Sequence, residues 1–352
     1  YRIDGILQEK LSIPINLHDS LVSRIKILSG MKIDEKRIPQ DGRFNFKAGE
    51  NEVDLRVSSL PTTWGEKIVM RLLKKSGGVP ELTELGLRGR GLKNLEDAIL
   101  RPHGIIIICG PTGSGKTTTL YSVISKINIP KVNIVTLEDP VEYKIPGVNQ
   151  VQINPAAGLT FASGLRSFLR QDPNIILVGE IRDKETTDLA IQASLTGHLV
   201  FSTLHTNNAA GALPRLLDMG AEPYLLASSM TAIVAQRVVR KIHDKCKEAY
   251  DPDPKIIEDM KNVLGTLWPQ GRDGKLYRGK GDAEDGDSGY FGRVGIFEVL
   301  PVTEKISRLI LERSAAPDIE KVAREEGMIT LKQDGSARSD NAEQRLDFWK
   351  ML

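Results

Sequence analysis

Short apolar runs recur along the middle of the chain, between residues 85 and 240. They lie at 105–109, 132–137, 175–178 and 199–203, and longer segments of mixed polarity separate them. Apolar runs of this length are typical of buried strands, and the longer segments are typical of helices. This alternation predicts an α/β domain built on a parallel sheet with helices on both faces.

The chain before residue 85 mixes two kinds of pattern. Apolar residues from Leu17 to Leu28 follow helical spacing, whereas residues 51–57 alternate like a half-buried strand. Asp41-Gly42 is a turn signal, and the glycines and proline from Ser76 to Pro80 are typical of a linker.

These patterns predict four parts. We expect a smaller N-terminal α/β domain at residues 1–75, a linker at 76–84 and a larger α/β core at 85–240. Residues 241–352 are predicted to form a mainly helical C-terminal region, interrupted by a Gly- and Asp-rich excursion from Gly271 to Gly292.

Composition excludes several classes of protein. Of the 352 residues 40% are apolar and 27% are charged, and the net charge is +2, so no strong overall field favours nucleic acid. No apolar stretch approaches the ~20 residues of a membrane span, and no signal peptide is apparent. Two cysteines suit a reducing compartment. We expect a cytoplasmic protein that meets a membrane only through partners, and, because the chain opens without methionine, a part of a longer protein.

One segment carries a specific chemical signal. Residues 110–117 fit the phosphate-loop pattern G-x-x-x-x-G-K-[ST], with a predicted strand before them and a predicted helix after them. In this motif backbone N–H groups close around phosphate oxygens at the start of a helix. The sequence therefore predicts ATP binding, with Lys116 on the β- and γ-phosphates and the Thr117 hydroxyl on Mg²⁺. The expected nucleotide-binding residues are Gly110, Pro111, Thr112, Gly113, Ser114, Gly115, Lys116, Thr117 and Thr118.

Acidic residues follow two of the later apolar runs. Glu138 follows the run at 132–137 and is placed to orient or deprotonate an attacking water, and Glu142 competes for this role. Glu180 follows the run at 175–178 in a Walker-B arrangement, which holds Mg²⁺, usually through water.

Candidate cations complete this set. His205 follows the run at 199–203 and is a candidate either for contact with the γ-phosphate or for a link between that phosphate and the subunit interface. Arg166 and Arg170 lie one helical turn apart, whereas Arg56 and Arg71 belong to the first domain. Phosphoryl transfer often recruits such cations from another domain or subunit. We expect all five to act in catalysis.

Together these segments resemble the secretion ATPases that drive type II secretion and type IV pilus assembly. The segments that match this family are 39–43 (Pro39 to Arg43), 54–58, 65–71, 110–117, 137–142, 169–173, 178–183 and 202–207. The resemblance covers residues 1 to about 335, and it implies a RecA-like P-loop NTPase core in a homo-hexameric ring. It further implies that the N-terminal domain closes on the nucleotide through Arg56 and Arg71, and that the ring drives an inner-membrane platform protein. The region through which the family docks on the membrane assembly is expected to lie outside this chain.

The chain departs from this family at a metal site. Where many members carry two Cys-x-x-Cys pairs, this sequence has His243 with Cys246 and Asp282 with Asp285. Structural zinc sites favour thiolates, so we predict that zinc is not bound tightly. The tail from Ser336 to Leu352 does not continue as the family does and has no predicted structure.

Two other classes of function remain open from the sequence. RecA-like rings also move nucleic acid, but no basic stripe with interleaved aromatics is present and only 5% of residues are aromatic. A nucleotide-binding scaffold without hydrolysis is opposed by the full set of acids and arginines. The boxes do not separate pilus assembly from type II secretion, and the remnant excursion in the C-terminal region disfavours a pilus-retraction motor.

Overall fold

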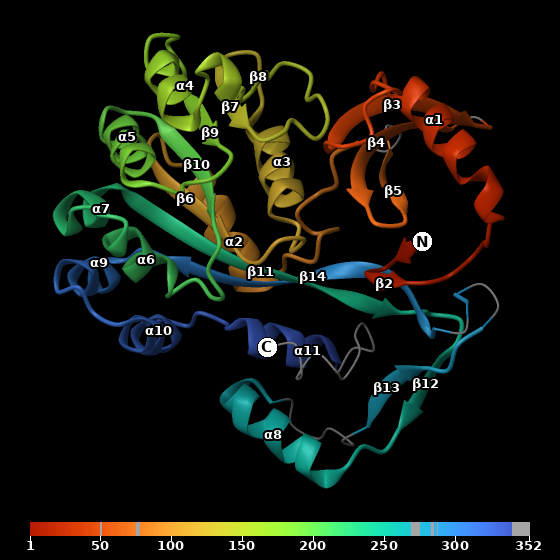
Figure 1. Cartoon of the computed structure of the whole chain (residues 1–352). Helices are drawn as coiled ribbons and strands as arrows, with labels where there is room; N and C mark the ends of the chain where they lie inside the picture. The colour runs from red at the N-terminus through yellow and green to blue at the C-terminus, as the bar shows by residue number, and fades with distance from the viewer. Residues whose placement is uncertain (50, 75–77, 269–274, 283–284, 287, 340–352) are drawn as a thin grey trace. The chain divides into compact units, whose positions relative to one another are not determined.

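A computed structural model describes residues 1–49, 51–74, 78–268, 275–282, 285–286 and 288–339 (Figure 1). The chain forms two compact units, Tyr1–Gly78 and Val79–Leu352. The predicted linker at 76–84 spans the junction, and residues 75–77 lie outside the described part. Leu82, within that predicted linker, is 2% exposed and belongs to the core of the second unit.

The first unit is one helix on a three-stranded antiparallel sheet. The sheet has the order β3-β4-β5, and a short hairpin, β1 with β2, precedes the helix. Val22 of the helix and Leu55 and Val57 of the central strand are buried, as the helical and alternating patterns predict. The elements are β1 (Arg2–Ile3), β2 (Ile6–Leu7), η1 (Ile15–Leu17), α1 (His18–Leu28), β3 (Gln40–Ala48), β4 (Asn51–Thr62) and β5 (Gly65–Lys74).

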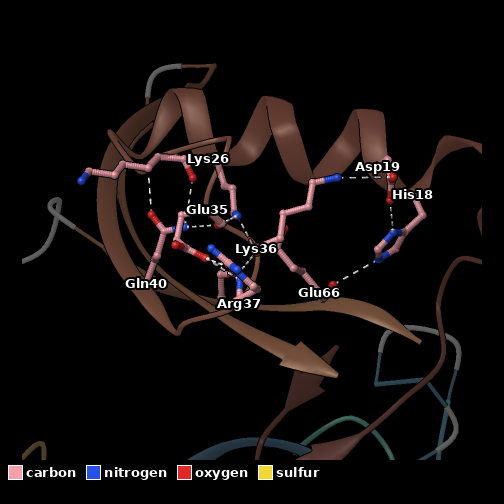
Figure 2. Close-up of polar contacts among 10 residues, drawn as sticks. His18, Asp19, Lys26, Glu35, Lys36, Arg37, Gln40 and Glu66 are labelled. Carbon is pink, nitrogen blue, oxygen red and sulfur yellow. Dashed lines mark hydrogen bonds and ion pairs between the residues drawn. The ribbon is translucent and has the colours of Figure 1, made fainter. Parts of the chain in front are cut away.

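A buried ion pair joins α1 to this sheet (Figure 2). The Lys26 ammonium pairs with the Glu66 carboxylate, and the two side chains are 1% and 7% exposed. Lys26 also donates to the Glu35 carbonyl at 2.8 Å, and the Ser59 hydroxyl donates to Glu66 at 2.7 Å. Because both charges have several partners, the pair fixes how α1 lies on the sheet. At the other end of α1, His18 Nε2 lies 3.1 Å from the Glu66 carbonyl oxygen.

The turn predicted at Asp41-Gly42 is wrong, because both residues lie within β3. Glycine has a different role here. A Cβ added to Gly42 would lie 2.2 Å from the Ser29 carbonyl oxygen, so glycine lets β3 pass close to the end of α1.

A seven-stranded sheet forms the centre of the second unit, in the order β14-β11-β6-β10-β9-β7-β8 (Figure 1). All four predicted strands are present, as β6, β7, β9 and β10. The sheet is mixed rather than parallel, because β14 runs antiparallel to β11. The strands are β6 (Gly104–Cys109), β7 (Ile134–Glu138), β8 (Asn149–Gln152), β9 (Ile175–Val178), β10 (Leu199–Leu204), β11 (Met230–Ile242) and β14 (Tyr290–Pro301).

Helices cover both faces of this sheet. Ile106 and Ile108 of β6 face a core that includes α2 (Gly89–Ile99) and α3 (Lys116–Ile127). Ile105 and Ile107 face the opposite core, which the remaining central helices complete. These are α4 (Phe161–Phe168), α5 (Lys184–Leu195), α6 (Ala212–Asp218), α7 (Pro223–Ser229), α9 (Glu304–Leu311) and α10 (Ala316–Glu325). These two layers of helices bury the central strands β6, β7, β9 and β10 and leave the strand ends for chemistry.

The region after residue 241 contributes helices, as expected, and also strands that the sequence did not predict. Instead of forming a separate part, it completes the central sheet through β14 and belongs to the second unit. Its other elements are β12 (Lys247–Tyr250), α8 (Pro254–Leu264), β13 (Leu276–Gly279) and α11 (Leu331–Ser339). The rest of the tail, 340–352, lies outside the described residues. Among the described helices, none has both the length and the apolar character that crossing a membrane requires.

Candidate functional site

The phosphate loop joins β6 to α3. Gly110, Gly113 and Gly115 all have positive φ, at 149°, 81° and 88°, which side chains with a Cβ rarely adopt. A Cβ on Gly110 would lie 2.5 Å from the Gln236 carbonyl oxygen, so the loop also packs too closely against β11 for another residue. Gly115 immediately precedes α3, and the loop therefore leads into the N-terminal end of that helix. This is the local geometry that the motif predicts for anion binding.

Lys116 lies folded over this loop. Its ammonium donates to the carbonyl oxygens of Gly110 at 2.8 Å and Pro111 at 3.1 Å. Burial lowers the pKa of Lys116, and the nearby charge of Glu180 acts in the opposite direction. The Ser114 hydroxyl is buried and has no hydrogen-bond partner among the described residues. An ammonium and an unpartnered hydroxyl in a loop with positive-φ glycines form a donor set suited to phosphate.

Thr117 and Thr118 occupy the first turn of α3, where Thr117 is exposed and Thr118 is half-buried. The next residue, Thr119, is buried and donates to the Gln236 side chain at 2.8 Å. Gln236 therefore holds the start of α3 against β11, a role that no sequence pattern indicated.

Glu180 follows β9 and lies near two cations and an imidazole. It pairs with Arg182 at 2.6 Å and with His205 at 3.6 Å, and its charge also reaches Lys116. The hydrogen bond from Arg182 to Glu180 raises the pKa of Arg182. The structure thus brings together Lys116, Glu180 and His205 as the sequence predicted, and it adds Arg182.

Glu138 ends β7 and is 3% exposed. Its carboxylate accepts hydrogen bonds from Thr136 at 2.6 Å, from Gln150 at 3.1 Å and from Tyr121. The backbone N–H of Glu142 donates to the Tyr121 hydroxyl at 3.2 Å, so one network links the two candidate acids. Burial, and then the bond to Glu138, raises the pKa of Tyr121, which keeps this phenol protonated. Tyr121 and Gln150 had no signal in the sequence.

The four candidate arginines lie in two groups. Arg166, near the end of α4, pairs with Glu185 of α5, and Arg170 donates to the Arg166 carbonyl at 3.2 Å. Arg56 and Arg71 belong to the first unit, where they face each other across β4 and β5.

The excursion after β11 brings together His243, Cys246, Asp282 and Asp285, whose ligand atoms all lie within 4.8 Å of one another. One Asp285 oxygen accepts the backbone N–H groups of Asp282, Ser288 and Gly289, at 3.2, 2.8 and 3.1 Å. The other lies 3.2 Å from both His243 Nδ1 and Cys246 Sγ. Although burial opposes it, these bonds lower the pKa of Asp285.

Both carboxylate oxygens of Asp285 therefore already have hydrogen-bond partners within this excursion. The four residues converge, but their single thiolate and the engaged Asp285 carboxylate fit zinc poorly compared with four thiolates.

Comparisons with known proteins identify the family of this chain. A profile of the family described as type II/IV secretion system protein matches residues 1–347. The chain belongs to this family. It is 47% identical over 334 residues to the type IV pilus assembly ATPase PilB of Thermus thermophilus and 47% identical over 347 residues to the type II secretion system protein E of Xanthomonas campestris. These matches cover 95% and 99% of this chain but only 37% and 60% of those relatives.

Solved structures of the same fold include a pilus motor and an ATPase. The pilus retraction motor PilT with bound ADP matches with a TM-score of 0.66 and 27% identity, covering 98% of this chain and 87% of PilT. The Legionella pneumophila ATPase DotB matches with a TM-score of 0.67 and 21% identity, covering 98% and 85% of the two chains. The RecA-like ATPase fold that the resemblance implied is confirmed.

Proposed function

We propose that this chain is the motor part of a longer ATPase that powers type IV pilus assembly or type II secretion. The observation that carries the proposal is the phosphate loop at the start of α3, with Glu180 placed close to Lys116. Relatives named for pilus assembly or type II secretion are 47% identical to the chain, whereas the retraction motor PilT is 27% identical. We therefore favour assembly or secretion over retraction.

In this proposal the loop glycines and Lys116 bind the β- and γ-phosphates. Thr117 and Glu180 would hold Mg²⁺, which offsets charge on the phosphates when bound. Arg182 and His205 fix the Glu180 carboxylate from two sides. Arg56, Arg71, Arg166 and Arg170 supply further positive charge to the transferred phosphoryl group.

Glu138 is the proposed acid that receives the proton of the attacking water. Three hydrogen bonds fix its orientation, and the hydrogen bond of a general base to its water often forms fully only in the substrate complex. Glu142 is the alternative, and its backbone N–H, not its carboxylate, is linked to Glu138 through the Tyr121 hydroxyl.

Single-turnover hydrolysis of ATP by Glu138→Gln and Glu142→Gln separates these assignments. We expect Glu138→Gln to slow the chemical step by roughly 10²- to 10⁴-fold with little change in ATP affinity, as for loss of a general base. A slow Glu142→Gln together with a Glu138→Gln of wild-type rate would transfer the role to Glu142.

The proposed assembly is a homo-hexamer that acts on an inner-membrane platform protein at the cytoplasmic face. Heterologous contacts that close into a ring give such a hexamer. Light scattering with a non-hydrolysable ATP analogue should show particles heavier than a dimer. A monomer at every protein and nucleotide concentration tested would contradict the ring, and tight salt-dependent binding of DNA or RNA would favour a translocase instead.

A further inference from the structure

The two oxygens of the Glu138 carboxylate have different surroundings. Oε1 accepts the Thr136 hydroxyl at 2.6 Å and a side-chain N–H of Gln150 at 3.1 Å. Among the residues that the structure describes, Oε2 accepts only the Tyr121 hydroxyl. A carboxylate oxygen has two lone pairs. Oε1 is therefore saturated, whereas Oε2 has one lone pair left that can accept a proton.

The Tyr121 hydroxyl is held as a donor to this second oxygen. The Tyr121 side chain is 1% exposed, and its ring packs edge-on against the Tyr143 ring at 4.5 Å between the ring centres. The hydroxyl accepts the backbone N–H of Glu142 at 3.2 Å, so its own proton points at Glu138. Burial raises the pKa of Tyr121, which keeps that proton on the phenol. The only recorded partner of Oε2 is thus a buried group with a fixed direction.

Tyr121 also connects this carboxylate to the phosphate loop. It lies on α3 four residues after Thr117, so the two side chains leave the helix on the same face, one turn apart. Glu138 lies at the end of β7. One hydrogen bond therefore joins the helix that begins at the phosphate loop to the strand that carries the carboxylate.

We propose that Tyr121 is a positioning residue for ATP hydrolysis, and that it holds Oε2 of Glu138 as the oxygen that receives the proton of the attacking water. In this step the water oxygen bonds to the γ-phosphorus, and the bond from the γ-phosphorus to the bridging oxygen of the leaving ADP breaks. One water proton passes to Oε2, and Tyr121 keeps its own proton. The inference rests on the proposed function, which makes Glu138 the base.

Tyr121→Phe tests the inference, because it removes the hydroxyl and keeps the buried ring. We expect the single-turnover rate of ATP hydrolysis by the full chain to fall roughly ten- to hundred-fold, the cost of a reacting group that is no longer held in place. Affinity for the non-hydrolysable analogue adenylyl imidodiphosphate with Mg²⁺ should not change, because the hydroxyl bonds to Glu138 and Glu142. A wild-type rate would overturn the inference.

The matched control is Tyr143→Phe. It removes a hydroxyl from the ring that packs against Tyr121, and among the described residues the Tyr143 hydroxyl has no recorded hydrogen bond. This variant should keep the wild-type rate. An equal loss of rate in both variants would show that the hydroxyl bond to Glu138 is not the cause, and it would contradict the inference.

A double variant separates positioning from a merely structural role. If Tyr121 acts through Glu138, Tyr121→Phe/Glu138→Gln should be no slower than Glu138→Gln, because the effects of residues that act as a unit are not additive. If the losses of the two single variants multiply instead, Tyr121 does not act through Glu138 and the inference is wrong.

The pH dependence of the rate gives a second measure of the same bond. The titratable groups recorded beside Glu138 are Tyr121 of α3 and, in the loop after β7, Glu142 and Tyr143, whose pKa burial raises to about 12. Neither phenol titrates in acid. Without the Tyr121 donor the charged form of the base is less stable, so the acid limb of the rate should move up by about one pH unit. An unmoved limb would overturn the inference.

Two kinds of failure remain distinguishable. If Glu138→Gln is slow and Tyr121→Phe has the wild-type rate, the inference is wrong and the proposed function stands. If Glu138→Gln itself keeps the wild-type rate, Glu138 is not the base, and the inference fails with that assignment.

Thermal unfolding checks that Tyr121→Phe folds. If it does not, replacement of Tyr121 by 3-fluorotyrosine decides, because the ring and the hydroxyl remain and the more acidic hydroxyl donates more strongly. The acid limb of the rate should then move to lower pH. A limb at the wild-type position would overturn the inference.

Discussion

Glu298 predicts an unusual dependence of stability on pH. This residue of β14 is 2% exposed, and it accepts the backbone N–H of Ala209 at 2.8 Å and that of Leu331 at 3.1 Å. It therefore ties the loop after β10 to the start of α11. Burial raises the pKa of Glu298 to about 7 from 4.5; the two N–H groups oppose this shift, and the charge of Glu320 adds to it.

The direction in which stability changes with pH follows from the number of protons bound in the folded and unfolded states. Between pH 4.5 and 7 the folded state holds a proton on Glu298 that the unfolded state has lost. The stability that this protonation contributes is complete below pH 4.5 and is lost as the pH rises through 7. A shift of this size corresponds to about 3 kcal/mol in total, of which about 2–3 kcal/mol falls between pH 5 and pH 8.

Glu298→Gln isolates this contribution, because glutamine does not titrate. Urea unfolding at pH 5 and pH 8 measures it in a Trp64→Phe/Trp349→Phe background, which leaves Trp268 of the second unit as the only tryptophan. We expect the wild type to lose about 2–3 kcal/mol more than Glu298→Gln over this range. Equal losses in the two proteins would refute the reasoning.

Two further predictions concern other buried polar groups. Lys26→Met should destabilise the first unit by about 3–5 kcal/mol, because it leaves Glu66 buried without a cation, and Lys26→Met/Glu66→Gln should recover most of that loss in thermal unfolding. Equal Tm values for the two variants would contradict this. Dialysed protein should contain well below one zinc per chain, and a chelator should leave its Tm unchanged, because hydrogen bonds to Asp285 already hold this excursion together. One zinc per chain by elemental analysis would overturn that prediction.

The sequence predicts the strands and the phosphate loop because their signals are local. A run such as 105–109 is apolar throughout and the loop pattern follows it, so no distant residue is needed to recognise either. The strand β14 was missed because it begins next to glycines, in a stretch that resembles a loop. Its pairing with β11, which is distant in sequence, makes it a strand.

The hydrogen-bond partners of the site residues could not be predicted from the sequence for the same reason. Glu138 meets Tyr121 and Gln150, which are 17 and 12 residues away in the sequence. Gln236 reaches Thr119 across 117 residues. Likewise, only the register of β4 and β5 places Arg56 directly opposite Arg71. Such contacts depend on tertiary packing, which residue types alone do not specify.

The central claim is that ATP is hydrolysed at this phosphate loop, and Lys116→Ala tests it most directly. Its control is Lys126→Ala, which removes the same charge from the far end of α3, where Lys126 pairs with Glu96 at 2.6 Å on the surface. Phosphate release from ATP and Mg²⁺ in a single turnover is the measurement. We predict that Lys116→Ala lowers the rate by at least roughly 10²-fold, as for loss of a main charge on the transferred phosphate, and that Lys126→Ala keeps the wild-type rate. Equal rates in Lys116→Ala and the wild type would contradict the account.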